Sequence, residues 1–277
     1  MTARPILATV DVVVGDVRIT ARDGATVSVD VRPSDTSNPE DVKAAEQTRV
    51  DHADEQLHVR APKLRSWLPR TAGGSIDVTI ELPAGSHLRA TGQMADFACD
   101  GRLGDCRIKT SLGRIAVDEA ETPNLKNGIG DITVDRANGH AEITSGSGDV
   151  RVRELGASAV IKNSNGETWV GDARGDLRIS AANGGITVDR AEASVVAKSS
   201  NGDVRLGEVV RGSVVLETRL GDLEIGIPEG TSAWLDARAA AGRVVNELEA
   251  SGAPEPKAET VEVRARTTAG NVAVRRP

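Results

Sequence analysis

Five acidic residues recur at one position of a repeated motif, and they are the first candidates for chemistry. The motif is a glycine, a polar residue and an alternating strand, as in G-D-V-R-V at 148–152. The acidic residues follow the glycine directly and are Asp131, Asp149, Glu167, Asp203 and Asp222. A row of carboxylates could bind calcium, and a pair of them could serve as the acid and the nucleophile of glycoside cleavage.

The surrounding residues favour neither kind of site. Calcium-binding β-rolls use several ligands in each turn and more glycine, and here Gly185 interrupts the row. Nothing distinguishes one acidic pair from the others. We therefore expect solvated carboxylates that accept N–H bonds from the turns, and we assign no catalytic residue, no metal site and no cofactor.

Thiol and imidazole groups give no stronger signal. Cys99 and Cys106 are the only cysteines, and no pair of histidines lies near them in the sequence, so a zinc site is not indicated. We expect idle thiols in a reducing compartment, with a redox pair as the alternative. The four histidines are scattered and have no clear Ser or Cys partner. The sequence also contains no nucleophile elbow, P-loop or dinucleotide-binding fingerprint.

The elements that carry these residues repeat with a fixed period. The motifs begin at Gly130, Gly148, Gly166, Gly184, Gly202 and Gly221, so the interval is 18 residues four times and 19 once. A second series lies midway, starting at residues 139, 157, 175, 193 and 212. Each half-repeat is therefore a short strand followed by a turn. Strand alternation places Val150 and Val152 on one face, and Asp149 and Arg151 on the other.

This period predicts an all-β fold, a right-handed parallel β-solenoid with 18-residue turns. One turn cannot bury its apolar face alone, whereas stacked turns can, because each strand bonds to its equivalent one turn away. Right-handedness follows the general preference of parallel β crossover connections. An antiparallel β-sandwich or barrel is the alternative, since it also shows strands at short, regular spacing.

The sequence suggests two regions. We interpret residues 1–95 as an irregular β region that caps one end of the stack, and residues 96–277 as the repeat region, with a loop insertion near 246–260. Within the first region, residues 75–82 form the clearest alternating strand. Residues 40–48 suit a helical turn, and pairing of a strand at 47–50 with a strand at 57–59 is the alternative. The final strands, near Val261 and Val272, are expected to close the far end.

Asparagine precedes glycine at three equivalent corners. The pairs are 165–166, 183–184 and 201–202. Both residue types tolerate positive φ, so we expect both to adopt it at a tight corner. Asn165, Asn183 and Asn201 should then stack as a ladder of amides.

Composition excludes several classes of function. The chain has 277 residues and a net charge of −7, with acidic and basic residues interleaved, whereas nucleic-acid binding needs a basic stripe. It has no Tyr, one Phe and three Trp, which argues against aromatic platforms for sugars or bases. The N-terminus lacks the apolar core of a signal peptide, and no apolar run is long enough for a transmembrane segment. We expect a cytoplasmic protein.

Two features suggest contact with a partner. Trp169 stands where neighbouring turns have Arg151 and Arg205, so it should point outward. Val160, Val196 and Val215 fall at outward positions of the other strand series. Exposed apolar side chains are often incidental, but a row of them can form an interface. We treat these four residues as a candidate surface for an unidentified protein or a second copy of the chain.

Several turns look familiar as a group. K-N-S-N-G-E-T at 162–168, A-A-N-G-G-I-T-V-D-R-A at 181–191 and G-T-S-A-W-L-D at 230–236 resemble a family of β-strand-repeat proteins that is common in actinobacteria. That family is often labelled "putative adhesin" or "domain of unknown function". The resemblance covers nearly the whole chain. It implies a β-solenoid without an established enzyme activity, and it supplies no catalytic residues.

Three functional hypotheses follow. The first is a non-enzymatic β-solenoid scaffold or protein-interaction module, with the capacity to self-associate. The second is a β-helix enzyme acting on a polysaccharide or another polar polymer, which would need a cleft with clustered acidic or basic residues on adjacent turns. The third is an adhesin-like protein of the cell envelope, which requires export.

Overall fold

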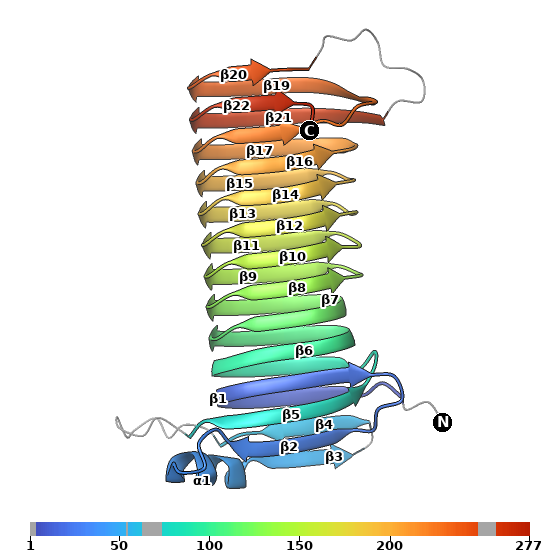
Figure 1. Ribbon diagram of the computed structural model, residues 1–277, viewed down its shortest axis with the longest axis vertical. Helices are drawn as coiled ribbons and strands as arrows, with labels where there is room; N and C mark the ends of the chain where they lie inside the picture. Colours follow the sequence, from blue (N-terminus) through green and yellow to red (C-terminus); the bar gives the residue numbers. More distant parts are fainter. Residues whose placement is uncertain (1–3, 54, 63–73, 249–258) are drawn as a thin grey trace. The chain divides into compact units, whose positions relative to one another are not determined.

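The computed structural model describes residues 4–53, 55–62, 74–248 and 259–277. The described chain is almost entirely β-strand, with one short helix (Figure 1). It divides into two compact units, Met1–Asp135 and Arg136–Pro277. Each unit is described in turn, beginning with the more regular second one.

The second unit consists of two interleaved ladders of parallel strands. One ladder contains β9 (Ala141–Ser147), β11 (Ala159–Asn165), β13 (Leu177–Asn183), β15 (Val195–Asn201), β17 (Gly212–Leu220), β21 (Glu259–Ala269) and β19 (Thr231–Ala241), in that order. The other contains β10 (Val150–Leu155), β12 (Thr168–Ala173), β14 (Ile186–Ala191), β16 (Val204–Val209), β18 (Leu223–Gly226), β22 (Val272–Arg275) and β20 (Val244–Asn246).

The register of these ladders confirms the parallel solenoid. Val150 lies opposite Thr168, which lies opposite Ile186, which lies opposite Val204. Equivalent residues one turn apart are therefore neighbours in one ladder, and the antiparallel sandwich is wrong. No observation bears on the expected right hand of the coil, which stays a prediction.

Alternate residues of both ladders form the core. Val150, Val152, Ile161 and Val204 are each 0% exposed, as the strand alternation predicts. Each interior turn contributes an inward pair of this kind from each ladder. Burial of apolar surface stabilises the folded state by about 25 cal/mol per Å². Every added turn therefore increases the free energy of unfolding that the core contributes.

Glycine with positive φ makes one of the two series of corners. Gly148, Gly166 and Gly184 all have positive φ, and a Cβ on Gly184 would lie 2.0 Å from the carbonyl oxygen of Gly166. The expectation of positive φ at the preceding asparagines is wrong, because among the described residues only Glu55 combines a side chain with positive φ. Those asparagines belong to the ends of the strands and keep extended backbone.

The predicted amide ladder is confirmed. Asn183 Nδ2 donates to Asn165 Oδ1 at 2.9 Å, and Asn201 Nδ2 donates to Asn183 Oδ1 at 2.8 Å. At the start of the ladder, Asn165 donates to the carbonyl oxygen of Gly146. Each amide therefore fixes the position of the next turn.

A column of inward polar residues supports the corners from inside. Asn163, Ser199, Thr218 and Thr267 donate to the carbonyl oxygens of Gly148, Gly184, Gly202 and Gly221, respectively. The donor–acceptor distances are 3.0–3.3 Å. A buried carbonyl without a partner is costly, so these side chains explain polar residues at core positions that the sequence pattern left without a role.

The C-terminal strands are inserted into the stack. β21 lies between β17 and β19, and β22 lies between β18 and β20. The expectation that the final strands close the far end is therefore wrong. The reason is burial: inward residues of β21 and β22, such as Val263 and Val272, are 0% exposed, as in an interior turn. β19 and β20 form the last turn.

The first unit contains β1 (Leu7–Arg22), β2 (Ser28–Pro33), α1 (Pro39–Gln47), β3 (Arg49–Ala53), β4 (Gln56–Arg60), β5 (Ile76–Pro83), β6 (His87–Leu112), β7 (Ile115–Ile129) and the start of β8 (Ile132–Ala137). The turn formed by β1 is also inserted. It pairs in parallel with β4 and β5 on one side and with β6 on the other. The antiparallel strands β3 and β2 then cover β4 and β5.

The structure confirms some of the sequence expectations for this unit and does not test others. Both options for residues 40–60 occur together, because α1 ends at Gln47 and β3 then pairs with β4. Asn38 caps the helix by accepting the N–H of Glu40. Residue 95, the predicted boundary, lies inside β6, and the division into cap and repeat region stays a prediction. The loop insertion expected near 246–260 falls largely outside the described residues.

The corner geometry predicts that a methyl group at Gly184 is far costlier than one at Gly230. Gly230 also has positive φ, but an added Cβ would meet nothing within 4 Å. We expect Gly230→Ala to cost about 1 kcal/mol of backbone strain, and Gly184→Ala to cost at least about 1–3 kcal/mol more through the clash. Denaturant unfolding followed by circular dichroism measures both; equal losses would contradict the packing of the corners.

Candidate functional site

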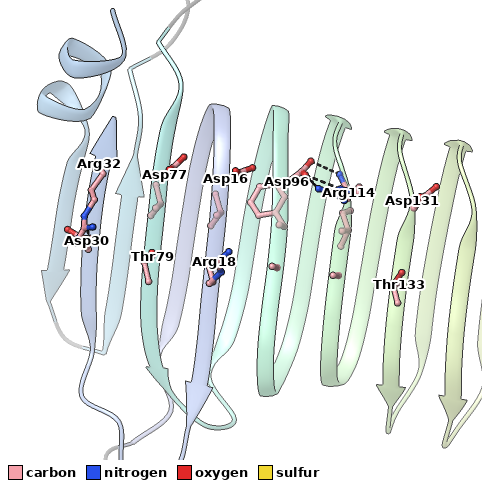
Figure 2. A pocket seen from close by; sticks show the side chains of 16 residues that line it. Asp16, Arg18, Asp30, Arg32, Asp77, Thr79, Asp96, Arg114, Asp131 and Thr133 are labelled. Carbon is pink, nitrogen blue, oxygen red and sulfur yellow. Dashed lines mark hydrogen bonds and ion pairs between the residues drawn. The ribbon is translucent and has the colours of Figure 1, made fainter. Parts of the chain in front are cut away.

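A polar pocket lies on the outward face of the first unit. It crosses β2, β5, β1, β6 and the beginnings of β7 and β8, and its cavity volume is about 780 Å³ (Figure 2). Its polar side chains come from outward positions of neighbouring strands. The register of the strands arranges these side chains in two rows.

The first row is mainly acidic. Arg32 lies opposite Asp77, Asp77 opposite Asp16, and Asp16 opposite Asp96. Arg114, at the corner before β7, follows Asp96. Neighbouring strands lie about 4.8 Å apart, so three carboxylates stand side by side between two arginines (Figure 2).

Arg114 and Ser34 satisfy the two outer carboxylates of this row, and the central carboxylate has no such partner among the residues described. Asp96 accepts the backbone N–H of Arg114 at 2.8 Å and its guanidinium at 3.0 and 3.1 Å. Asp77 accepts the hydroxyl of Ser34 at 2.6 Å. Within the part of the chain that the structure describes, the Asp16 carboxylate has no hydrogen bond and no ion pair.

This environment changes the protonation of Asp16. Partial burial, followed by the charges of Asp96 and Asp77, raises the pKa of the Asp16 carboxyl. Arg114 and Arg18 act in the opposite direction but are weaker. Asp16 therefore holds a proton to higher pH than an ordinary aspartate. A cationic group placed beside it would relieve the same repulsion.

The second row combines a guanidinium with small and hydroxyl side chains. Asp30 lies opposite Thr79, Thr79 opposite Arg18, and Arg18 opposite Ala98. Asp30 forms an ion pair with Arg32 at 2.6 Å. Over the described residues, Arg18 forms no ion pair, and Ala98 leaves space beside it. The pocket can thus bind a cationic group at the acidic row and an anionic or hydroxyl group at Arg18.

Metal binding finds no support in the described ranges. They contain no group of three or more His, Cys, Asp or Glu side chains arranged to hold a metal ion. The acidic row predicted from the repeat instead binds backbone. Glu167 N–H donates to Asp149 at 2.9 Å, and Asp222 N–H donates to Asp203 at 2.8 Å. The prediction that these carboxylates accept N–H bonds from the turns is confirmed for Asp149, Asp203 and Asp222, the last of which accepts the N–H of Asn271 at 2.6 Å.

The two cysteines face each other inside β6. Both are free and buried. A hydrogen bond from Cys106 and burial raise the pKa of the Cys99 thiol well above its ordinary value. The thiolate, which is the reactive form, is therefore disfavoured. The expectation of idle thiols, with a redox pair as the alternative, stays a prediction.

The four residues of the predicted partner surface lie on two different ladders. Val160, Val196 and Val215 form one outward column with Arg178, and all three valines are half-buried. Trp169 belongs to β12 in the other ladder, where its Nε1 donates to Asp189 at 3.2 Å. The structure thus brings the valines together and leaves Trp169 apart from them.

Sequence reasoning missed the pocket because its strands do not follow the 18-residue interval. Asp16 and Asp96 are 80 residues apart and yet adjacent. A signal was available in the motif itself. G-D-V-R-I at 15–19 matches G-D-V-R-V at 148–152, and A-D-F-A at 95–98 is a weaker copy. Aligning these copies would have placed Asp16 and Asp96 in one column.

The chain matches one family model and resembles solved structures over almost all of its length. The model described as Toastrack DUF4097 matches residues 9–275. A "putative cell adhesion protein" from Clostridium sporogenes (14% identity, TM-score 0.23) aligns with 99% of this chain and 94% of its own. A "putative adhesin" from Bacteroides fragilis (13%, TM-score 0.38) aligns with 99% and 96%. At these TM-scores the two alignments do not show a shared fold. No curated protein matches, and no match supports an actinobacterial origin.

The carboxylate row predicts opposite effects of two substitutions. Asp16→Asn should stabilise the protein at pH 7, because the ionised Asp16 is disfavoured in the folded state. The gain should disappear below about pH 4, where the unfolded carboxyl is protonated too. Asp96→Asn should destabilise at pH 7, since it removes the partner of Arg114. Thermal melts of both variants between pH 3 and 8 test this, and a loss of stability in Asp16→Asn at neutral pH would refute it.

Proposed function

The chain belongs to the Toastrack DUF4097 family, and on this basis we propose that it is a non-enzymatic β-solenoid scaffold that binds a protein partner through an outward column. The observation that carries the proposal is the valine column, Val160, Val196 and Val215. Their side chains repeat at a fixed spacing along one ladder, with Arg178 between the first two. In soluble proteins, an aligned apolar strip of this kind is typical of contact surfaces.

The ladder makes this column well suited to binding. Backbone bonds on both sides hold each strand, and β-branched side chains have few rotamers to lose on contact. Ordering of side chains and loops is a main cost of association, so a preordered surface binds with less loss. Charged residues continue the column at both ends: Glu142 lies opposite Val160, and Arg264 lies opposite Val215. A partner with an apolar strip between charged groups would match it.

No helix in the described part of the chain is both long enough and apolar enough to cross a membrane. The proposed compartment remains the cytoplasm, as expected from the sequence, and the adhesin-like alternative requires export. Fractionation of cells with an antibody to the protein distinguishes the two.

The pocket favours a second candidate function, an enzyme acting on a polysaccharide. This hypothesis required clustered charges on adjacent turns, and the acidic row has that arrangement. A carboxyl with a raised pKa, such as Asp16, is the kind of group that protonates the leaving oxygen in glycoside hydrolysis. If this is the function, the protein releases reducing ends from a polysaccharide panel, Asp16→Asn abolishes release, and Asp203→Asn, outside the pocket, does not. Absence of release removes this candidate.

The scaffold proposal predicts that partner binding depends on one ladder. Val196→Asp places a charge in the valine column, and Thr187→Asp places the same charge on the other ladder, beside Trp169. We expect Val196→Asp to reduce partner capture at least tenfold and Thr187→Asp to leave it unchanged. Quantitative affinity purification from the native cells, with mass spectrometry, measures capture for wild type, both variants and Trp169→Ala.

The pattern of loss identifies the surface. Loss in Val196→Asp alone supports the valine column. Loss only in Trp169→Ala and Thr187→Asp would transfer the contact to the Trp169 ladder and refute the column. If all three variants still capture the partner, neither the valine column nor the Trp169 ladder is the contact surface. Circular dichroism melts of each variant confirm that the fold is retained.

A further inference from the structure

The last turn of the second unit has a free edge. β19 pairs with β21 along its inner side, and β20 pairs with β22. Among the strands of the described residues, none pairs with the outer side of β19 or β20. The outer N–H and C=O groups of β19, an 11-residue strand, are therefore available for pairing.

The core is also open at this turn. Val244 is 46% exposed, whereas Val272, its neighbour one turn inward, is 0% exposed. Leu235 and Ala237 share the inward orientation of buried Val263 and Ala265, but they are only half-buried. Trp234 is 58% exposed on the outward side of the same strand. The apolar columns of the interior thus continue to the surface here.

β19, unlike the three-residue β20, lacks several of the devices that normally prevent pairing. Natural edge strands are kept apart by shortness, proline, bulges or inward charges. β19 contains no proline, and its inward residues are uncharged. In the first unit, by contrast, the outermost parallel strands β4 and β5 are covered by antiparallel β3 and β2. Among the described residues, β19 is therefore the edge strand that is long, apolar on its inward face and not covered by another strand.

Backbone direction shows which residues face the free edge. In interior turns the inward residues donate to the following turn: Ala159 N–H to Asp176 and Leu177 N–H to Ser194, both at 2.9 Å. β19 continues this order. Its inward residues Ala233, Leu235 and Ala237 therefore direct their backbone groups outward, along the edge.

We propose that this edge pairs with the same edge of a second copy of the chain, in antiparallel orientation about a twofold axis at Ala237. A twofold axis turns a strand into its own antiparallel neighbour, so the interface is self-complementary. Residues whose backbone groups face the edge then bond to each other: Ala237 to Ala237, and Leu235 to Ala239 of the second copy. This inference does not depend on the valine column.

Charge favours this register over its neighbours. Within its own chain Asp236 already forms ion pairs with Arg238, Arg264 and Arg266, and the second copy would add a further arginine beside it. With the axis at Ala237, Asp236 lies opposite Arg238 of the second copy, and the same pair forms again across the axis. The pair is of the non-hydrogen-bonded type, in which side chains are closest. An axis at Asp236 would place two aspartates opposite each other, and an axis at Arg238 would place two arginines together. Both arrangements are destabilising.

The second copy would also close the core. Leu235 meets Ala239, and Ala233 meets Ala241, so the inward columns continue across the axis without a polar interruption. Trp234 lies diagonal to Arg238 of the second copy, within reach of a cation–π contact. The interface therefore covers the half-exposed apolar residues that distinguish this turn from interior ones.

Cysteine cross-linking tests the axis directly. In Ala237→Cys the two new thiols would face each other at a Cα separation of about 5.5 Å, within the range for a disulfide. Ala233→Cys is a matched variant at another inward position of the same strand. Its two thiols would be about 27 Å apart, because residue 233 lies opposite residue 241 of the second copy, eight residues along the strand from that copy's residue 233. Cys99 and Cys106 are buried and do not interfere. Under mild oxidation of the full chain, we expect a covalent dimer from Ala237→Cys and at least tenfold less from Ala233→Cys.

Sedimentation velocity on the uncross-linked chain provides the second measurement. We expect wild type to be dimeric at micromolar concentration. Arg238→Asp, which places like charges opposite Asp236, should raise the dissociation constant at least tenfold, whereas Arg178→Asp on β13 should not. A monomeric wild type, chains longer than dimers, equal cross-linking of the two cysteine variants, or an unaffected Arg238→Asp would each overturn the proposal.

Discussion

Backbone hydrogen bonding between equivalent residues of successive turns is the constraint on which the structure depends. The backbone groups of each turn must align with the equivalent groups of the next turn. Corresponding corners must therefore be equally tight in every turn. Glycine meets this requirement because a Cβ at Gly166, Gly184 or Gly202 would come within 2.0–2.2 Å of the preceding turn's carbonyl oxygen. The fixed corners then align the inward residues into columns and the outward residues into rows.

The rows inherit their chemistry from this alignment. A residue at a corner necessarily stacks on the equivalent residue of the next turn, and where these residues are asparagines the stacking produces the amide ladder at Asn165, Asn183 and Asn201. Carboxylates would repel each other in the same arrangement unless they have partners. At Asp149 and Asp203 the partner is a backbone N–H. Asp16 lacks such a partner among the described residues, and partial burial together with the charges of Asp96 and Asp77 raises the pKa of its carboxyl.

The regular repeat explains what could be predicted. Parallel pairing, the inward columns and the amide ladder all follow from an 18-residue interval that is visible in the sequence. The inserted turns could not be derived from it, because β1 and β21 join the stack out of chain order. β1 pairs with a strand 80 residues away, and β21 pairs with a strand 49 residues away. Local sequence patterns do not indicate such distant pairing. The pocket was missed for the same reason, since two of its carboxylates, Asp16 and Asp96, meet only through the insertion of β1.

Distances between spin labels along one outward column test the stacking order most directly. Lys162, Ser180, Lys198, Glu217, Arg266 and Arg238 follow one another in register. At about 4.8 Å per turn, label positions replacing Lys162 and Arg266 should be about 19 Å apart, and those replacing Lys162 and Arg238 about 24 Å. Double electron–electron resonance should therefore show the later residue in the sequence to be the nearer one. A shorter distance to position 238 than to position 266 would contradict the account.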